Sequence, residues 1–266
     1  MRRLTLAVLA SLALAGPAAA HRVWMLPSST VLSGTDAWVT LDAAVSNELF
    51  VFEHVPLRLD GLTVTGPDGA PVTPENTATG KFRSTFDLHL TKPGSYRAAV
   101  TNEGLMASYK VGGQPKRWRG KADSMVREIP ADAQDVTLTE SIQRTETFVT
   151  VGKPNTAAFA PSGKGLELRF DTHPNNLAAG EAARFTLLLD GAPAPGIDVE
   201  VVRGGSRYRD KSEEVKLKSG PDGTVTVPFA QAGLYWFGAE TQDDKAKTTG
   251  ARRRAVYNAT FEVLPQ

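Results

Sequence analysis

The chain has 266 residues, no cysteine and a formal net charge of +1. The lack of cysteine excludes disulfides, thiolate metal sites and cysteine nucleophiles, so the fold must be held by its own apolar core. The nearly balanced charge gives no reason to expect binding to nucleic acid or to a membrane surface.

The first twenty residues have the pattern of a secretory signal. Arg2 and Arg3 precede an apolar run from Leu4 to Leu14, and small residues follow at Ala18–Ala20. This run is shorter than the about 20 residues that a transmembrane helix needs, and no later stretch is longer and as apolar. We therefore expect cleavage after Ala20 and a periplasmic protein that is not embedded in the membrane.

Short segments that alternate apolar and polar residues predict an all-β chain. In the first half, the apolar positions that share one side are Val39, Leu41 and Ala43; Phe82, Phe86, Leu88 and Leu90; and Tyr96, Ala98 and Val100. In the second half they are Leu166, Leu168 and Phe170; Phe185, Leu187 and Leu189; Ile197, Val199 and Val201; Val225, Val227 and Phe229; Tyr235 and Phe237; and Tyr257, Phe261 and Val263.

The two halves use the same turn chemistry, which predicts two sandwich domains of similar architecture. Gly-Pro-Asp-Gly occurs at 66–69 and again at 220–223. Between the halves, 112–127 is basic and lacks periodicity, Thr145–Val151 has the pattern of one more strand, and 152–165 is rich in turn residues. Domains commonly have roughly 100–150 residues. We therefore expect a signal at 1–20, an N-terminal β-sandwich with a basic linker segment at 21–160, and a C-terminal β-sandwich at 161–266.

His21 is the first candidate for chemistry, because cleavage after Ala20 would make it the first residue. An N-terminal histidine carries an α-amine and an imidazole, which together form a two-nitrogen chelate for a transition metal. Their ordinary pKa values of about 7.7–8.0 and about 6.5 allow both to lose protons to a metal near neutral pH. Apolar residues from Val23 to Pro27 are expected to anchor the segment. The alternative is a flexible, solvated terminus.

His54 is the second candidate ligand. It shares strand parity with Phe50 and Phe52, which places it at the end of a buried face, with Glu48 or Glu53 as a nearby carboxylate. The alternative is a histidine at the edge of the core with one hydrogen bond.

The other two histidines are His173, which follows a predicted strand, and His89, which lies on the polar side of another. His173 is a third candidate ligand, because loops carry function more often than strands; the alternative is a capped turn histidine. We expect His89 to be solvated. No pair of histidines has metal-motif spacing, so any site must be assembled by the fold.

No pattern for an enzyme is present. The serines lie in no nucleophile-elbow sequence, and no phosphate-binding loop is found. We therefore expect a protein that is not an enzyme.

Several short motifs resemble those of one bacterial family. The motifs are His21–Pro27, His173–Leu177, Gly180–Glu181, Asp190–Pro193, Pro195–Gly196, Asp222–Gly223 and Ala232–Tyr235. The chain resembles the periplasmic domains of unknown function that are associated with nickel or cobalt transport and are similar to NikM-type components. The resemblance implies two β-sandwiches, immunoglobulin-like or transthyretin-like, and a link to outer-membrane receptors for metal or iron uptake. The chain departs from that pattern at Arg22-Val23, where an acidic residue and Phe are more typical.

We accordingly expect a periplasmic accessory protein that binds a divalent transition metal, Ni, Co, Cu or Zn, through His21 and either His54 or His173. Its expected partners are membrane transporter or outer-membrane receptor components. One alternative is a non-catalytic interaction or adhesion module without a metal. A less favoured alternative is a copper oxygenase with a terminal histidine, which would need a flat aromatic face that the sequence does not indicate.

Overall fold

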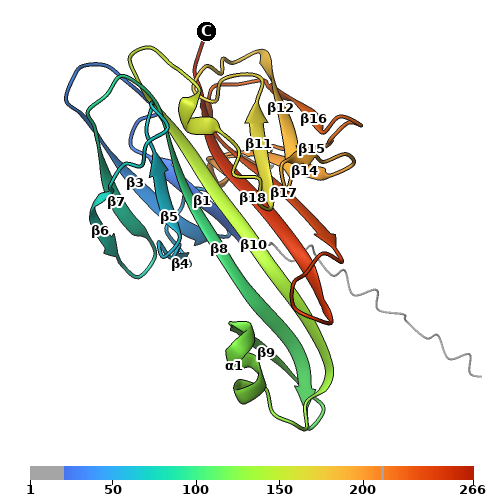
Figure 1. Ribbon diagram of the computed structural model, residues 1–266. Coiled ribbons are helices and arrows are strands. Elements are labelled where there is room, and N and C mark those ends of the chain that lie inside the picture. The colour runs from blue at the N-terminus through green and yellow to red at the C-terminus, as the bar shows by residue number, and fades with distance from the viewer. Residues whose placement is uncertain (1–20, 211–212) are drawn as a thin grey trace, which may run out of the picture.

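The computed structural model describes residues 21–210 and 213–266, so the predicted signal lies outside the described residues. In these ranges it contains three β-sheets and one short α-helix (Figure 1). The all-β fold class is confirmed. Among the described helices, none has the length and apolar character needed to cross a membrane.

Sheet A is built from the N-terminal part of the chain. Its five strands, in spatial order, are β1 (Arg22–Pro27), β3 (Ala37–Ser46), β7 (Ser84–Leu90) and β6 (Glu75–Thr79), with β4 (Val55–Pro56) paired to β3. All of these pairs are antiparallel. The alternation in β3 and β7 buries one side of the sheet and leaves polar residues on the other.

Sheet B has nine strands and runs through both halves of the chain. Its strands are β15 (Glu214–Lys218), β14 (Asp198–Arg203), β17 (Gly233–Asp243), β18 (Ala251–Val263), β10 (Gln134–Val151), β8 (Gly94–Val111) and β5 (Leu62–Thr65), with β2 (Val31–Leu32) on β10 and β9 (Gln114–Gly120) on β8. β10 pairs in parallel with β18 and antiparallel with β8. This pairing joins the two halves through backbone hydrogen bonds.

Sheet C covers part of sheet B. It consists of β11 (Leu166–Phe170), β12 (Glu181–Leu189), β13 (Ala192–Pro193) and β16 (Thr224–Phe229). The described helical elements are α1 (Ala122–Glu128) and the 3₁₀ turns η1 (Ala157–Phe159) and η2 (Ser206–Tyr208).

Two large apolar cores lie on opposite faces of β10. Val149 belongs to the core beneath sheet A, whereas its neighbour Phe148 belongs to the core beneath sheet C. Successive side chains of a strand point to opposite faces, so one strand contributes to both cores. The predicted strand at Thr145–Val151 is confirmed as the end of β10. Sheet B contains strands from before and after residue 160. The expected domain boundary near residue 160 stays a prediction.

The far ends of β8 and β10 extend beyond the two cores and carry β9 and α1 (Figure 1). The basic stretch at 112–127 therefore contains a strand and a helix, although its sequence has no apolar period. β9 is an edge strand whose side chains are mostly exposed on both faces. Because neither face is buried, its alternate positions do not need apolar residues. The indole of Trp118 donates to Glu128 Oε2 at 2.7 Å, which ties α1 to β9.

Candidate functional site at the junction of the two halves

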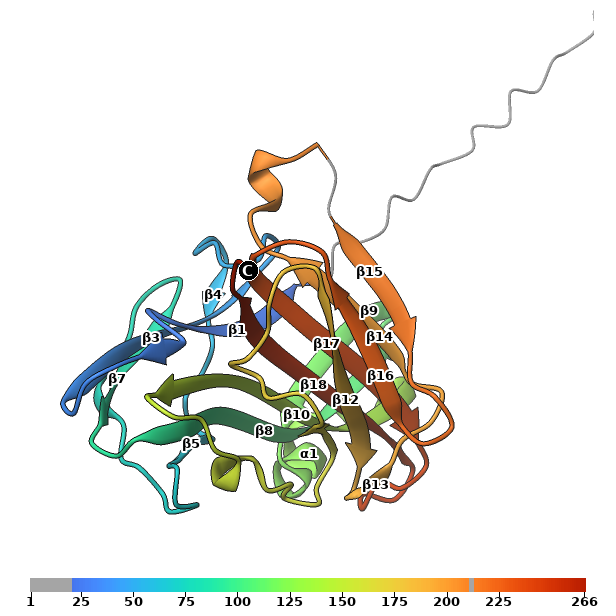
Figure 2. The same cartoon turned by 90° about the horizontal axis from the view of Figure 1, so that it is seen from above.

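The segment after His21 is anchored between the two halves of the molecule. Trp24 and Met25 are fully buried and point in opposite directions. Met25 enters the core beneath sheet A, whereas Trp24 packs in a smaller cluster with Val202 and Trp236 of sheet B. Seen from above, β1 lies between β3 and the strands β17 and β18 (Figure 2). The expected anchoring by the apolar residues of this segment is confirmed.

Polar contacts fix the same segment more tightly. The indole of Trp24 donates to Ser46 Oγ at 2.8 Å, and the indole of Trp236 donates to the carbonyl oxygen of Val23 at 2.9 Å. Arg22 pairs with Glu200, and its guanidinium lies 5.4 Å from the centre of the Trp236 ring. The backbone directly after His21 is therefore held on both sides.

The fold brings His21 and His54 together. Their imidazole rings stack at a centroid distance of 4.0 Å with an interplanar angle of 7°. Both residues are exposed to solvent. His54 does not end a buried strand as its parity with Phe50 and Phe52 predicted, because Phe50 has a φ of 63° and turns the chain before β4. This loop, not a strand, presents His54 to His21.

His173 is not part of this pair. Its Nε2 lies 3.0 Å from Ser95 Oγ and 3.1 Å from the carbonyl oxygen of Asn155, and its Nδ1 accepts from the backbone of Asn175 at 3.1 Å. Burial lowers the pKa of His173 below its ordinary value. Both ring nitrogens thus have protein partners, as the capped-turn alternative predicted.

The place of His173 also separates it from His21. His173 contacts Ser95 of β8, and Ser95 pairs with Thr150 of β10. Thr150 in turn pairs with Val31, which follows β1 in the chain. His21 precedes the opposite end of β1, and this strand alone spans roughly 20 Å at about 3.3 Å per residue. Of the two expected partners for His21, the fold brings only His54 close.

The two carboxylates expected near His54 have other contacts. Glu48 pairs with Arg207, at 3.1 Å between Oε2 and Nε. Glu53 Oε1 accepts the backbone N–H groups of Asn47 and Glu48, and the latter bond is the main reason that the pKa of Glu53 lies below its ordinary value. In the described ranges, no group of three or more His, Asp or Glu side chains has the geometry of a metal site.

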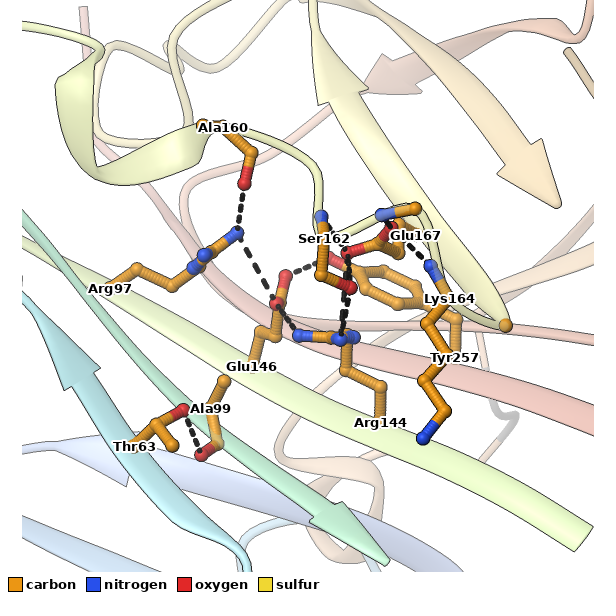
Figure 3. A network of polar contacts seen from close by, with 12 residues as sticks. Thr63, Arg97, Ala99, Arg144, Glu146, Ala160, Ser162, Lys164, Glu167 and Tyr257 are labelled. Carbon is orange, nitrogen blue, oxygen red and sulfur yellow. Dashed lines mark hydrogen bonds and ion pairs between the residues drawn. The ribbon is translucent and has the colours of Figure 1, made fainter. Parts of the chain in front are cut away.

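A buried ionic network lies between β10 and the segment that leads to sheet C, and sequence reasoning did not find it (Figure 3). Arg144 Nη1 lies 3.3 Å from Glu146 Oε1, and Arg144 Nη2 lies 3.5 Å from Glu167 Oε1. All three side chains are buried. In the sequence, Arg144 and Glu146 look like the polar side of an ordinary strand, so no local signal marks them.

Hydrogen bonds complete this network. Tyr257 donates to Glu146 Oε2 at 2.8 Å, and burial raises the pKa of this tyrosine well above its ordinary value. Ser162 donates its backbone and side-chain protons to Glu167 at 2.9 and 2.8 Å. The network fastens the segment near residue 162 to β10 and β18, and it gives no sign of a ligand.

Comparison of the sequence with protein-family models identifies one family. Residues 18–243 match the family described as a domain of unknown function, DUF4198. A search of curated proteins found no match.

A search of solved structures gave matches of low similarity, of which three are described. The D0–D1 domain of intimin is 12% identical, with 90% of this chain and 97% of that chain covered and a TM-score of 0.23. A DUF4785 family protein from Legionella pneumophila is 7% identical, with 81% and 50% covered and a TM-score of 0.26. The fibronectin(III)-like modules of CbhA from Clostridium thermocellum are 12% identical, with 91% and 94% covered and a TM-score of 0.21. Because the family match extends over most of its length, the chain belongs to the DUF4198 family of domains of unknown function.

Proposed function

We propose that the protein is an exported, non-catalytic accessory protein that binds a divalent transition metal through His21 and His54. The observation that carries this proposal is the pairing of two exposed imidazoles whose ring centroids are 4.0 Å apart. In this proposal the protein works in the periplasm in metal uptake, with nickel and cobalt as the first candidates and iron as a further one. Its partner is a membrane transporter or an outer-membrane receptor.

The two rings are close enough to share one ion, but they are not oriented for it as they stand. Two metal–nitrogen bonds of about 2.0–2.1 Å each join nitrogens at most about 4.2 Å apart, whereas the stacked rings, with centroids 4.0 Å apart, direct their nitrogen lone pairs side by side. Both side chains are exposed, so rotation about their side-chain torsions can turn a nitrogen of each ring toward the same ion. Cleavage after Ala20 would add the α-amine of His21 as a third nitrogen donor. Imidazole and amine donors suit Ni, Co, Cu and Zn, and affinity alone favours Cu.

The anchoring of β1 supports the same proposal. A chelate binds tightly when its donors are held in place before the metal arrives, because less conformational freedom is then lost. The contacts of Arg22 and Trp236 hold the backbone next to His21, and Trp24 is fully buried three residues later.

Calorimetric titration of Cu²⁺, Ni²⁺, Co²⁺ and Zn²⁺ tests the proposal. The protein should be exported and processed by its own cell type, with the N-terminus confirmed by intact mass. We expect one-to-one binding that weakens about tenfold or more in His21→Ala, in His54→Ala and in a variant with one extra residue before His21. His89→Ala is the matched control, because His89 is also partly exposed but contacts Asp36 and Trp38 instead.

Equal affinity in wild type and all three variants would refute the proposed site. The protein would then be better described as an interaction module whose histidines do not bind metal.

A further inference from the structure

The His21–His54 pair leaves a bound metal incompletely coordinated. It supplies two ring nitrogens, and the processed terminus adds one amine, whereas these metals take four to six donors. In the described part of the chain, no third His, Asp or Glu side chain joins the pair in a metal-binding group. Glu48 and Glu53 are engaged with Arg207 and with backbone N–H groups. The remaining positions are therefore open to water or to a donor from a second molecule.

A groove of about 530 Å³ lies beside the pair, between the loop at 48–52 and the loop at 204–208. Phe52 lines the groove and precedes His54 by two residues, so their Cα atoms are at most about 7 Å apart. The ring of Phe52 is also 5.6 Å from that of Trp24, which follows His21 by three residues. The volume falls within the roughly 300–1,000 Å³ of small-molecule sites and exceeds what a hydrated ion needs.

The lining of this groove is suited to a flat organic molecule. Leu49, Val51 and Leu234 contribute apolar surface, and Tyr208 is 83% exposed. Phe52 is 37% exposed, with the guanidinium of Arg83 4.5 Å from the centre of its ring. Exposed aromatic rings at a groove gain by stacking on a planar conjugated ring.

The loop that forms one wall is held in an uncommon conformation. Phe50 has a φ of 63°, which a bulky residue rarely adopts without compensation from its surroundings. That compensation comes from the other wall, because the Phe50 ring packs where a side chain on Gly204 would otherwise lie, and a Cβ there would be 2.6 Å from Phe50 Cδ2. The ion pair between Glu48 and Arg207 joins the same two loops. The groove is thus a built feature of the junction.

We infer that the metal reaches His21 and His54 as a complex with a planar aromatic chelator, whose rings occupy this groove while the histidines take the open coordination positions. This inference rests on the function proposed above and specifies its ligand. The two histidines bind the metal, and Phe52 and Tyr208 discriminate between its organic carriers.

Two copper complexes provide a matched pair of probes. Cu²⁺ with 2,2′-bipyridine and Cu²⁺ with ethylenediamine each present two neutral nitrogen donors and the same charge, but only the first is aromatic. We expect the processed protein to bind the bipyridine complex about tenfold more tightly than the ethylenediamine complex. Calorimetry gives both affinities, and electron paramagnetic resonance reports whether imidazole nitrogens coordinate the copper.

Variants separate the groove from the histidines. Tyr208→Ser, at an exposed position, and Phe52→Ala should each weaken binding of the bipyridine complex at least about threefold more than they weaken binding of the ethylenediamine complex. Phe82→Ala is the control for Phe52→Ala, because Phe82 is 38% exposed, close to the 37% of Phe52, and does not line the groove. His54→Ala should weaken both complexes.

The outcomes are distinguishable. Equal affinity for the two complexes, or a preference that survives both groove variants, would overturn the inference and leave the histidine site standing. Binding of neither complex, or binding that His54→Ala does not change, would overturn the inference together with the proposed function.

Discussion

The indole N–H of Trp236 donates to the carbonyl oxygen of Val23 at 2.9 Å, although 213 positions separate the two residues in the sequence. This hydrogen bond connects β17 of sheet B to the first strand of sheet A, two residues after His21. The geometry of the candidate site therefore depends on a residue far away in the chain.

Replacing Trp236 with Phe should destabilise the protein and loosen His21. The variant loses the donor to Val23 and part of the ring beside Arg22, and a lost hydrogen bond of this kind costs about 0.5–1.5 kcal/mol. Urea denaturation measures this cost, and the metal titration should show weaker binding. Trp118→Phe is the control, because its indole binds the exposed end of α1. An equal loss of metal affinity in both variants would contradict the role of Trp236.

Gly204→Ala should disturb the loop that carries His54. The new Cβ would lie 2.6 Å from Phe50 Cδ2, so the ring must move. Overpacking of this kind costs about 1–3 kcal/mol in the free energy of unfolding, and the displaced loop should also lower metal affinity. In Gly104→Ala the nearest atom is 3.7 Å away, so chemical denaturation should show little change.

Tyr257→Phe should cost more stability than Tyr235→Phe. Both hydroxyls donate at 2.8 Å, Tyr257 to the buried carboxylate of Glu146 and Tyr235 to the backbone carbonyl of Gln231. Hydrogen bonds to charged groups contribute about 1.5–3 kcal/mol and neutral ones about 0.5–1.5 kcal/mol. Denaturant titrations of the two variants test this order. Equal costs would mean that Glu146 is satisfied by its arginine partners without the tyrosine.

Acidification should destabilise the protein through His173. Burial lowers the pKa of His173 in the folded state below its ordinary value of 6.5, so the unfolded chain takes up this proton more readily. The contribution is fully present above pH 6.5 and is lost as the pH falls from there through the lowered folded pKa. In His173→Gln, the loss of unfolding free energy between about pH 7.5 and 5 should be smaller than in wild type. Identical pH profiles would show that His173 is not held neutral by the fold.

Strands with one buried side were predictable, because burial of alternate residues leaves a period of two in the sequence. Phe86, Leu88 and Leu90 are buried on β7 as expected. Phe82 has the same parity but lies before the strand and is 38% exposed. Parity continues through a sequence whether or not the backbone stays extended, so it cannot mark where a strand begins.

The site was predictable in part. The apolar residues after His21 indicated an anchored segment, and His54 was one of two expected partners. The reason that His54 meets His21 lies in the positive φ of Phe50 and in the contact of its ring with Gly204. Neither is visible from local sequence, because the contact joins two loops that are far apart in the chain. The network of Arg144 and Glu146 was hidden for the same reason, since its partners Ser162, Glu167 and Tyr257 come from later parts of the chain.

The strand β10 leaves the two halves no hinge. Phe148 and Val149 contribute to both cores, and the backbone of β10 pairs with β18, so rotation of one half against the other would have to break this parallel ladder. The strands that lead into the loops at 48–52 and 204–208 therefore cannot turn as two separate bodies, and the ion pair between Glu48 and Arg207 joins the loops themselves. Recognition at the junction is expected to be preorganised, with selectivity set by shape and not by motion.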